Sequence, residues 1–448
     1  MPEWFANLPP VVQALIRVLI FVLPVLLLVP GAIWYERRLL SWAQDRIGPN
    51  RVGNITFSRR GKYIPSFLKG KKFHLFGLIQ PIADGIKLFM KEDITPTAVD
   101  RPIYFIAPAL ALFPAFTLGA TIPWGPFTWL TPVADVNIGI LWIIAVSSLG
   151  VYGVVLSGYA SNNKYSLLGG LRASAQLISY ELGMGMALAC IVMATGSLRP
   201  TDIVAAQQEP LWGVVPALAN WNIFTPYGFI AAIIFFICMV AETNRAPFDL
   251  PEAENELVAG YHTEYSSMKF AVFFMGEYAA MMVYGGILAT VFFGGYHLLP
   301  VRWDWIIQQY PASNFIAGFF RDVDYWLSPL TFIFKGVLVL TAYIWLRATM
   351  PRLRYDQLMA LGWKTLLPLA TTNLIVVALW IVAARVYGPP VGILSAVVAF
   401  AILYGLWRGL DKAFSPPKAF LAPRSITLVN VPKPTPAPAP ESEVAPSA

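Results

Sequence analysis

Long apolar runs recur along the chain and limit what it can fold into. A membrane-spanning helix needs about 20 mostly apolar residues. Such runs lie at 11–34, 103–122, 137–158, 174–195, 228–241, 268–293, 329–347, 365–384 and 391–407. The run at 228–241 is short by itself and would have to borrow residues from its flanks. The sequence therefore predicts an all-α polytopic membrane protein with eight transmembrane helices and a ninth near the C-terminus.

The basic residues indicate how these helices are oriented. A net charge of +7 would suit nucleic-acid binding, but 57% hydrophobic and 13% charged residues are far from a soluble composition. Of the 32 Lys and Arg residues, 21 fall in the odd-numbered loops between the runs and 4 in the even-numbered loops. By the positive-inside rule, the odd loops are cytoplasmic and the N-terminus is periplasmic. No nucleic-acid partner is expected.

The runs also suggest a domain division. Residues 1–385 are predicted to form the membrane domain, and the first run is expected to stay as a helix because no cleavage site follows it. The ninth run defines a segment at 386–412. The Pro- and Ala-rich residues 413–448 are expected to be a disordered cytoplasmic tail.

The chain lacks the ligand spacings of metal and redox centres. Cys190 and Cys238 lie inside apolar runs without a CxxC or Cys/His pattern. The three histidines are far apart, and only His262 lies within an acidic stretch. We therefore expect no metal site and no redox cofactor bound by this chain alone.

Acidic residues concentrate between two apolar runs, in the segment 241–265. This segment holds six of the 25 Asp and Glu residues: Glu242, Asp249, Glu252, Glu254, Glu256 and Glu264. A charged side chain near hydrocarbon costs roughly 2.5–3.5 kcal/mol on insertion scales, so carboxylates beside spans usually face a bundle interior or a watery cavity. A solvated acidic loop is the alternative that composition leaves open.

Three charged residues are predicted to lie within spans. Glu181 and Glu277 each have apolar residues on both sides. Because burial disfavours the charged form, both suit a proton relay; a structural hydrogen bond to a neighbouring helix is the alternative. Lys335 is either a counter-charge or a side chain that reaches the interface.

The segments after the first run have the pattern of amphipathic interfacial helices on the cytoplasmic side. Apolar residues recur at helical spacing over 39–47 beside arginines. In GLIQPIADGIKLFMKEDITP, Asp84, Lys87 and Lys91 share one helix face, which a surface ion pair explains equally well. The basic insertion at 54–76 suits anionic lipid or an acidic partner.

Four segments together resemble the H-subunit family of proton-pumping NADH:quinone oxidoreductase, respiratory complex I. They are ERRLLSWAQDRIGPNRVG, GLIQPIADGIKLFMKEDITP, SNNKYSLLGGLRASAQLISYE and AETNRAPFDLPEAENELVAGYHTEYS, within a match over about 11–385. The resemblance implies eight conserved helices at the junction of the membrane and peripheral arms. It also implies that such a chain forms much of a quinone channel and couples quinone reduction to proton translocation.

The resemblance further implies roles for individual residues. The positions that match the quinone channel are Glu36, Arg37, Arg38, Asp84, Lys87 and Arg245. The positions that match proton-coupling carboxylates are Glu181, Glu242, Asp249, Glu252, Glu254, Glu256 and Glu264. No catalytic redox residue is implied on this chain, because the FMN and iron–sulfur clusters of the family sit on partner subunits.

The implied substrate is a quinone, and the implied partners are the other membrane-arm and peripheral-arm subunits and membrane lipid, in a bacterial inner membrane. The insertion at 54–76, the loop at 297–327 and the ninth run with its tail exceed the usual family length. One alternative is the homologous membrane subunit of an energy-converting hydrogenase or related dehydrogenase. Another is a cation/proton antiporter, which should show paired inverted repeats.

Overall fold

A computed structural model describes residues 3–50, 52, 55–56, 72–73, 76–127, 129–251, 258–310 and 314–388, with isolated positions at 398, 401, 404–405 and 408. The chain divides into two units, 1–400 and 401–448, and the fold and sites below lie in the first unit.

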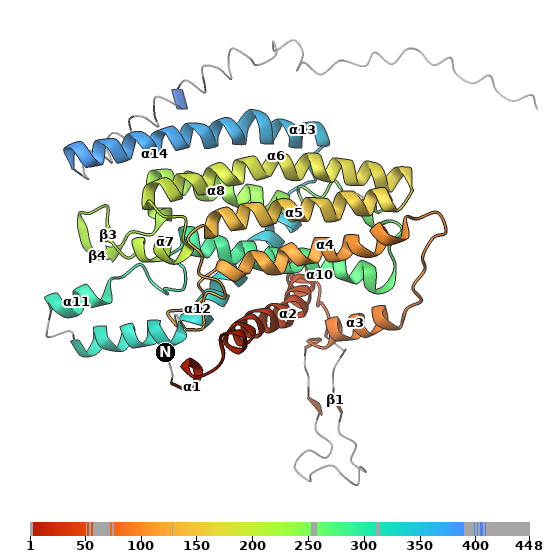
Figure 1. The fold of residues 1–448 in the computed structure, drawn as a ribbon, viewed down its shortest axis with the longest axis horizontal. Helices are drawn as coiled ribbons and strands as arrows, with labels where there is room; N and C mark the ends of the chain where they lie inside the picture. The colour runs from red at the N-terminus through yellow and green to blue at the C-terminus, as the bar shows by residue number, and fades with distance from the viewer. Residues whose placement is uncertain are drawn as a thin grey trace, which may run out of the picture. The chain divides into compact units, whose positions relative to one another are not determined.

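The first unit is a bundle of long helices (Figure 1). Its helices are α1 (Glu3–Ala6), α2 (Pro10–Ala43), α3 (Gln80–Met90), α4 (Arg101–Leu118), α5 (Gly139–Ala160), α6 (Lys164–Thr195), α7 (Pro200–Ala206), α8 (Pro226–Glu242), α10 (Ser267–Phe292), α11 (Trp303–Gln309), α12 (Asn314–Thr349), α13 (Tyr355–Ala360) and α14 (Leu367–Tyr387). Short helical turns are η1 (Gly119–Thr121), η2 (Asn222–Phe224), η3 (Gly260–His262) and η5 (Leu361–Leu366). Two small antiparallel pairs join β1 (Ile55–Thr56) to β2 (Lys72–Phe73) and β3 (Pro210–Leu211) to β4 (Val215–Ala219).

Eight helical segments match the first eight apolar runs. Among the described residues, seven are long and apolar enough to cross a membrane: Pro10–Ala43, Arg101–Thr121, Gly139–Ala160, Lys164–Thr195, Ser267–Phe292, Phe315–Thr349 and Tyr355–Tyr387. The eighth, α8, has 17 residues and is roughly 25 Å long at 1.5 Å per residue. The all-α polytopic fold is therefore confirmed. The ninth run, the tail and most of the insertion at 54–76 fall outside the described residues.

Local sequence signals explain where several helices begin and end. Before α6, the Asn163 side chain accepts a hydrogen bond from the backbone N–H of Tyr165, and the helix ends at Gly196 in a left-handed conformation. Before α8, the Thr225 hydroxyl caps the backbone N–H of Gly228. These caps satisfy backbone groups that helix ends leave unpaired.

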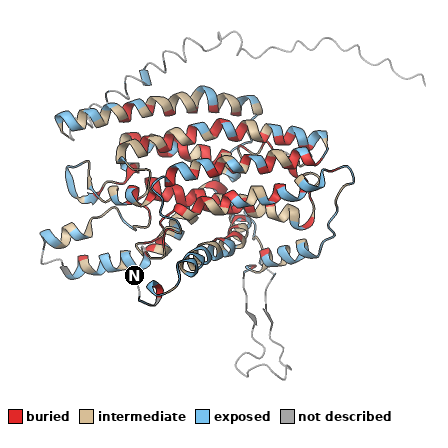
Figure 2. Cartoon of the chain, viewed as in Figure 1, coloured by how far each residue is buried: buried red, intermediate tan, exposed pale blue. Residues whose placement is uncertain are grey.

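Buried residues concentrate in the middle of the bundle, on α4, α5, α6, α8 and α10 (Figure 2). Glycines allow these helices to approach closely. A Cβ atom at Gly153 of α5 would lie 2.5 Å from the backbone nitrogen of Ala111 in α4. Small residues at such crossings are the usual way in which membrane helices pack.

The two ends of the bundle carry different connections (Figure 1). At one end, here the α11 end, β4 bonds to the segment after α10, since the N–H of Ala219 donates to the carbonyl of Pro300. At the other, here the α3 end, Lys269 at the start of α10 pairs with Asp93 just after α3 at 2.9 Å. The segment between α8 and α10 also lies at the α3 end.

Two local predictions need correction. The predicted interfacial helix over 39–47 does not form as a separate element, because α2 continues without a break to Ala43. The second segment does form its own helix, α3, whose exposed apolar residues are Ile82, Ile86, Phe89 and Met90. The loop predicted at 297–327 is largely helical, since it contains α11 and the first turns of α12.

Candidate functional site

A cavity of about 500 Å³, here the first cavity, lies at the α3 end of the bundle. Its lining comes from α2, α10, α12, η3 and the segment after α8: Glu36, Arg37, Leu40, Asn244, Arg245, Ala246, Asp249, His262, Phe270, Phe274, Tyr278, Arg347 and Arg352. Charged and aromatic side chains are therefore combined in one space beside membrane-spanning helices. Its volume is typical of a pocket for a small organic molecule.

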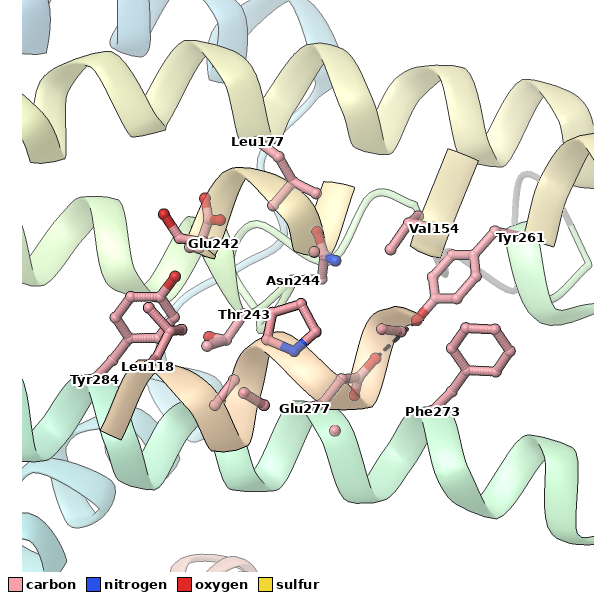
Figure 3. Close-up of a pocket in the computed structure, with 17 residues that line it drawn as sticks. Leu118, Val154, Leu177, Glu242, Thr243, Asn244, Tyr261, Phe273, Glu277 and Tyr284 are labelled. Atoms are coloured by element: carbon pink, nitrogen blue, oxygen red, sulfur yellow. Dashed lines mark hydrogen bonds between the residues drawn. The ribbon is translucent and has the colours of Figure 1, made fainter. Parts of the chain in front are cut away.

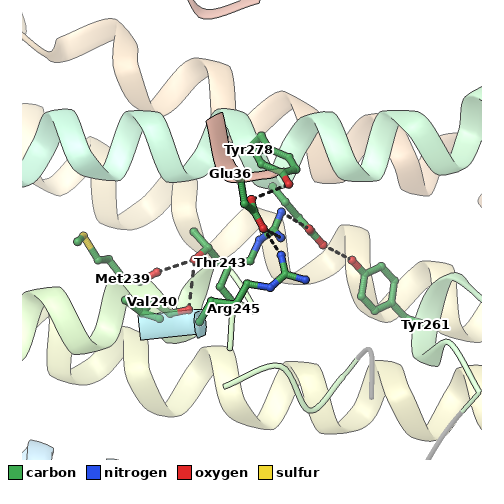
Figure 4. Close-up of polar contacts among 9 residues, drawn as sticks. Glu36, Met239, Val240, Thr243, Arg245, Tyr261 and Tyr278 are labelled. Carbon is green, nitrogen blue, oxygen red and sulfur yellow. Dashed lines mark hydrogen bonds and ion pairs between the residues drawn. The ribbon is translucent and has the colours of Figure 1, made fainter. Parts of the chain in front are cut away.

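Glu36 of α2 lies at the centre of the polar contacts in this cavity (Figure 4). Its carboxylate accepts a hydrogen bond of 2.7 Å from the Tyr278 hydroxyl of α10. It also forms a salt bridge with Arg347 of α12, and Arg245 Nη1 lies 3.9 Å away. Glu36 is only 5% exposed, and a carboxylate that deep in a bundle requires such partners.

Arg245 links Glu36 to a second carboxylate. Its Nη2 atom lies 3.4 Å from the Glu277 carboxylate, and its guanidinium lies over the Tyr278 ring at 4.4 Å from the centroid. Glu277 in turn accepts a 2.9 Å hydrogen bond from the Tyr261 hydroxyl. The side chains of Arg245 and Glu277 are 11% and 12% exposed, so this ion pair is shielded from water.

The turn after α8 places Arg245 in the cavity. Asn244 has a positive φ of 49°, and the N–H of Arg245 donates to the carbonyl of Val240. The Thr243 hydroxyl donates to carbonyls in the last turn of α8, which closes the helix end. Asn tolerates the left-handed conformation better than most residues, so the TNR sequence suits this sharp exit.

A smaller cavity of about 80 Å³, here the second cavity, lies deeper in the bundle (Figure 3). Glu242, Glu277, Tyr284 and Ser147 are among its lining residues, and Asn244 lines both cavities. One carboxylate oxygen of Glu242 is buried and makes no hydrogen bond with the described part of the chain. Because Glu277 pairs with Arg245 of the first cavity, charged side chains connect the two spaces.

Glu181 of α6 lies next to the second cavity. The Ser148 hydroxyl of α5 donates to its carboxylate, and the Ser147 hydroxyl lies 3.4 Å from the same oxygen. Ser147 also lines the second cavity. A series of carboxylates therefore leads from Glu36 through Glu277 and Glu242 to Glu181.

Other residues singled out by the sequence take different positions. Arg37 pairs with Asp84 of α3 at 2.6 Å. Arg38 donates to the carbonyl of Pro49 at 2.9 Å, and Lys87 is exposed on α3. The first two contacts fasten α3 and the chain before it to the end of α2.

The carboxylates of the acidic segment separate into three groups. Asp249 lines the first cavity and pairs with Arg352 at 2.9 Å. Glu264 lines neither cavity and accepts a 2.7 Å hydrogen bond from Asn163. The remaining three, Glu252, Glu254 and Glu256, fall outside the described residues.

Sequence reasoning did not find four polar residues of this network: Arg347, Arg352, Tyr261 and Tyr278. Arg347 ends an apolar run, where a basic residue is usually no more than the flank of a span. Tyr278 adjoins Glu277, which is the one signal that could have pointed to it. Within the described residues, no group of three or more His, Cys, Asp and Glu side chains is placed to hold a metal ion.

Comparison with known proteins agrees with this architecture. The family model described as NADH dehydrogenase matches residues 16–378. The NADH-quinone oxidoreductase H subunit of Ralstonia pickettii is 44% identical over 383 residues, which cover 85% of this chain and 95% of that protein. The first of the numbered H subunits of Geobacter metallireducens is 45% identical over 370 residues, covering 81% and 94%. The second of those of Geobacter sulfurreducens is 46% identical over 360 residues, covering 79% and 91%.

A match of this extent and identity shows the family, and the helical bundle of membrane-spanning length is the fold that such a protein requires. The chain belongs to the family of NADH-quinone oxidoreductase H subunits and is a multi-pass membrane component of that enzyme complex.

Proposed function

We propose that the first cavity forms part of the quinone-binding channel of the complex, and that the linked carboxylates couple quinone reduction to proton translocation. The observation that carries the proposal is the charged connection between the two cavities through Arg245 and Glu277. The names of the relatives include quinone, and the volume and the mixed aromatic and charged lining of the first cavity suit a polar aromatic head group.

The chemistry of this chain would be electrostatic. A quinone gains negative charge as it receives electrons and loses that charge as it takes up protons. Negative charge in the first cavity would compete with Glu36 and Glu277 for the Arg245 guanidinium. Since a shielded carboxylate that loses its cation is costly, Glu277 would then take up a proton.

Protons would pass between the carboxylates by way of the second cavity. Glu242 has a buried oxygen without a hydrogen-bond partner among the described residues and faces the same space as Glu277. Ser147 and Ser148 lie between that space and Glu181. A proton taken up by Glu277 would thus reach Glu181 through Glu242.

Partners and location follow from the same proposal. FMN and iron–sulfur clusters would be held by partner subunits of the two arms, and this chain would supply the quinone path. The membrane would be a bacterial inner membrane, with the N-terminus periplasmic and the acidic segment cytoplasmic, as the loop charges indicate. Every relative given above carries the H-subunit name, which favours this function over the hydrogenase and antiporter alternatives.

The test is a comparison of Glu242→Gln with Glu209→Gln in membranes that contain the whole complex. Glu209 is exposed just before β3 at the α11 end and serves as the matched control. NADH oxidation by an artificial acceptor, NADH-driven quinone reduction and proton pumping are measured on the same membranes. We expect Glu242→Gln to keep acceptor activity and to lower quinone reduction and pumping by roughly tenfold, equivalent to about 1.4 kcal/mol in the barrier.

The outcomes separate coupling from structure. If acceptor activity, quinone reduction and pumping all persist in Glu242→Gln, this carboxylate has no part in coupling. If quinone reduction persists while pumping is lost, the carboxylate acts in proton transfer but not in the response to quinone. Loss of all three in Glu242→Gln would show a structural role, and the more conservative Glu242→Asp then tests whether a carboxylate restores pumping.

A further inference from the structure

A separate cavity of about 420 Å³, here the α11 cavity, lies at the opposite end of the bundle from Glu36 (Figure 1). Its walls come from the segment after α10, from α11 and from the first turns of α12. It shares no lining residue with the first or the second cavity. The proposed quinone and proton functions therefore leave it unexplained.

Hydrogen-bond donors gather around this cavity. Arg302 and Arg321 both line it, and Arg302 donates through Nη1 to the carbonyl of Pro216 at 3.0 Å. A guanidinium carries five N–H donors, so this bond uses only part of its capacity. Gln208 lines the same cavity, and its side-chain nitrogen is buried without a hydrogen-bond partner in the described part of the chain. Donors of this kind favour a phosphate group.

The cavity also contains a rim of the opposite sign. Asp304 lines it, has a side chain that is 81% exposed, and lies 3.8 Å from Arg321. An anion alone would gain nothing from this carboxylate. A group that carries an ammonium next to its phosphate would be bound by both charges.

The position of the cavity indicates how such a group would arrive. It adjoins the segment after Phe292, where the membrane-spanning part of α10 ends. Trp303 and Trp305 line it, and tryptophans are enriched at the level of lipid head groups. Beside it, the first turns of α12 expose Phe315 and Phe319, which are 89% and 60% accessible. An apolar surface next to a phosphate site suits acyl chains.

We propose that the α11 cavity binds the head group of a single phospholipid, of the phosphatidylethanolamine type. Arg302, Arg321 and Gln208 hold its phosphate, Asp304 holds its ammonium, and the acyl chains lie along the exposed aromatic residues of α12. With the orientation predicted from the loop charges, this lipid belongs to the outer leaflet.

The test uses the purified whole complex in nanodiscs that contain a phosphatidylethanolamine probe with a diazirine in its acyl chain. After irradiation, labelled peptides from residues 296–326 are quantified by mass spectrometry. We expect the double variant Arg321→Gln, Gln208→Met to lower this labelling by about tenfold, the scale of losing a charge-assisted hydrogen bond. The matched control is Arg199→Gln, because Arg199 is exposed, pairs with Asp135 at 2.5 Å and does not line the cavity.

Several outcomes would overturn the proposal. Equal labelling of the double variant and the control would show that the cavity does not select the lipid. Displacement of the probe by inorganic phosphate would show a site for a soluble anion. An equal signal from a phosphatidylglycerol probe, unchanged in Asp304→Asn, would disprove the ethanolamine assignment. NADH oxidation by an artificial acceptor, measured on every variant, confirms that the complex is assembled, and Gln208→Met alone repeats the test without removing a charge.

Discussion

Arg245 makes the most demanding set of contacts of any single residue in the first cavity. One guanidinium lies between the carboxylates of Glu36 and Glu277 and over the ring of Tyr278. The planar fork of Arg can donate in several directions at once, whereas the Lys ammonium is a compact point charge. The identity of this cation therefore matters as much as its charge.

We expect Arg245→Lys to lower NADH-driven quinone reduction by roughly tenfold while acceptor activity is kept, because the ammonium cannot serve both carboxylates. The control is Arg199→Lys, at an exposed pair with Asp135, where surface ion pairs contribute little. Both rates are measured on membranes over a range of quinone concentrations. Wild-type quinone kinetics in Arg245→Lys would show that positive charge alone is sufficient.

Lys335 closes the end of α10. Its ammonium donates to the carbonyls of Phe293, Gly295 and His297 at 2.6, 2.9 and 2.5 Å, and it lies 4.4 Å from the centre of the Trp221 ring. Cations are favoured beside helix C-termini, where carbonyls lack partners. Of the two roles that the sequence left open, a counter-charge to these carbonyls describes the contacts.

We expect Lys335→Met to lower the thermal stability of the complex, because each buried carbonyl left without a donor costs about 1–3 kcal/mol. The measurement is the temperature at which assembled complex is lost on a native gel. Lys364→Met serves as the control, since Lys364 is exposed on η5. Equal midpoints for the two variants would contradict a role for Lys335 in holding α10.

At the scale of the elements, the approach of α4 to α5 depends on a missing side chain. A Cβ at Gly153 would lie 2.5 Å from the backbone nitrogen of Ala111, whereas a Cβ at Gly150, one turn earlier on α5, would have its nearest neighbour at 3.9 Å. The same substitution therefore meets a backbone atom at one position and open space at the other.

We expect Gly153→Ala to lower the stability of the complex by about 1–3 kcal/mol, the usual cost of overpacking, and Gly150→Ala to leave it unchanged. Because both variants gain the same methyl group and the same helix propensity, the difference between them reports the α4–α5 contact. The midpoint of thermal inactivation of quinone reduction measures it. A loss of equal size in both variants would show that the contact tolerates a methyl group.

The elements themselves were largely predictable from the sequence, because apolar runs of membrane-spanning length have few alternatives. The end of α2 was not. An apolar stripe beside arginines is typical of an interfacial helix, but the last turns of a long spanning helix have the same pattern, and α2 continues to Ala43. The helical character of 297–327 was also missed, since its mixture of Pro and charged residues resembles a loop.

At the scale of the whole molecule, the first cavity could not be assembled from local patterns. Glu36, Arg245, Glu277 and Arg347 come from four segments that are far apart in sequence. The apolar runs predicted that Glu277 is buried, and the family resemblance pointed to Glu36 and Arg245. The pairing of Arg347 with Glu36 depends on how α12 packs beside α2, and one chain carries no local signal for that packing.

The orientation of the molecule in the membrane can be tested with probes at the α11 end and the α3 end. Both native cysteines, Cys190 and Cys238, are buried, so a new surface thiol is readily distinguished. Glu209→Cys places a thiol at the α11 end, and Arg354→Cys places one after α12, where the Arg354 side chain is 80% exposed. The excess of basic residues in the odd loops requires the α3 end to face the cytoplasm.

We therefore expect a membrane-impermeant maleimide to label Glu209→Cys in intact cells and to label Arg354→Cys only in inverted vesicles. A partner subunit covering Arg354 would block labelling from both sides, so denatured samples establish that the thiol is present. Labelling of Glu209→Cys only in inverted vesicles would reverse the orientation. The first cavity would then open to the periplasm, away from any cytoplasmic source of electrons, and the proposed coupling path would have to be abandoned together with the outer-leaflet position of the lipid.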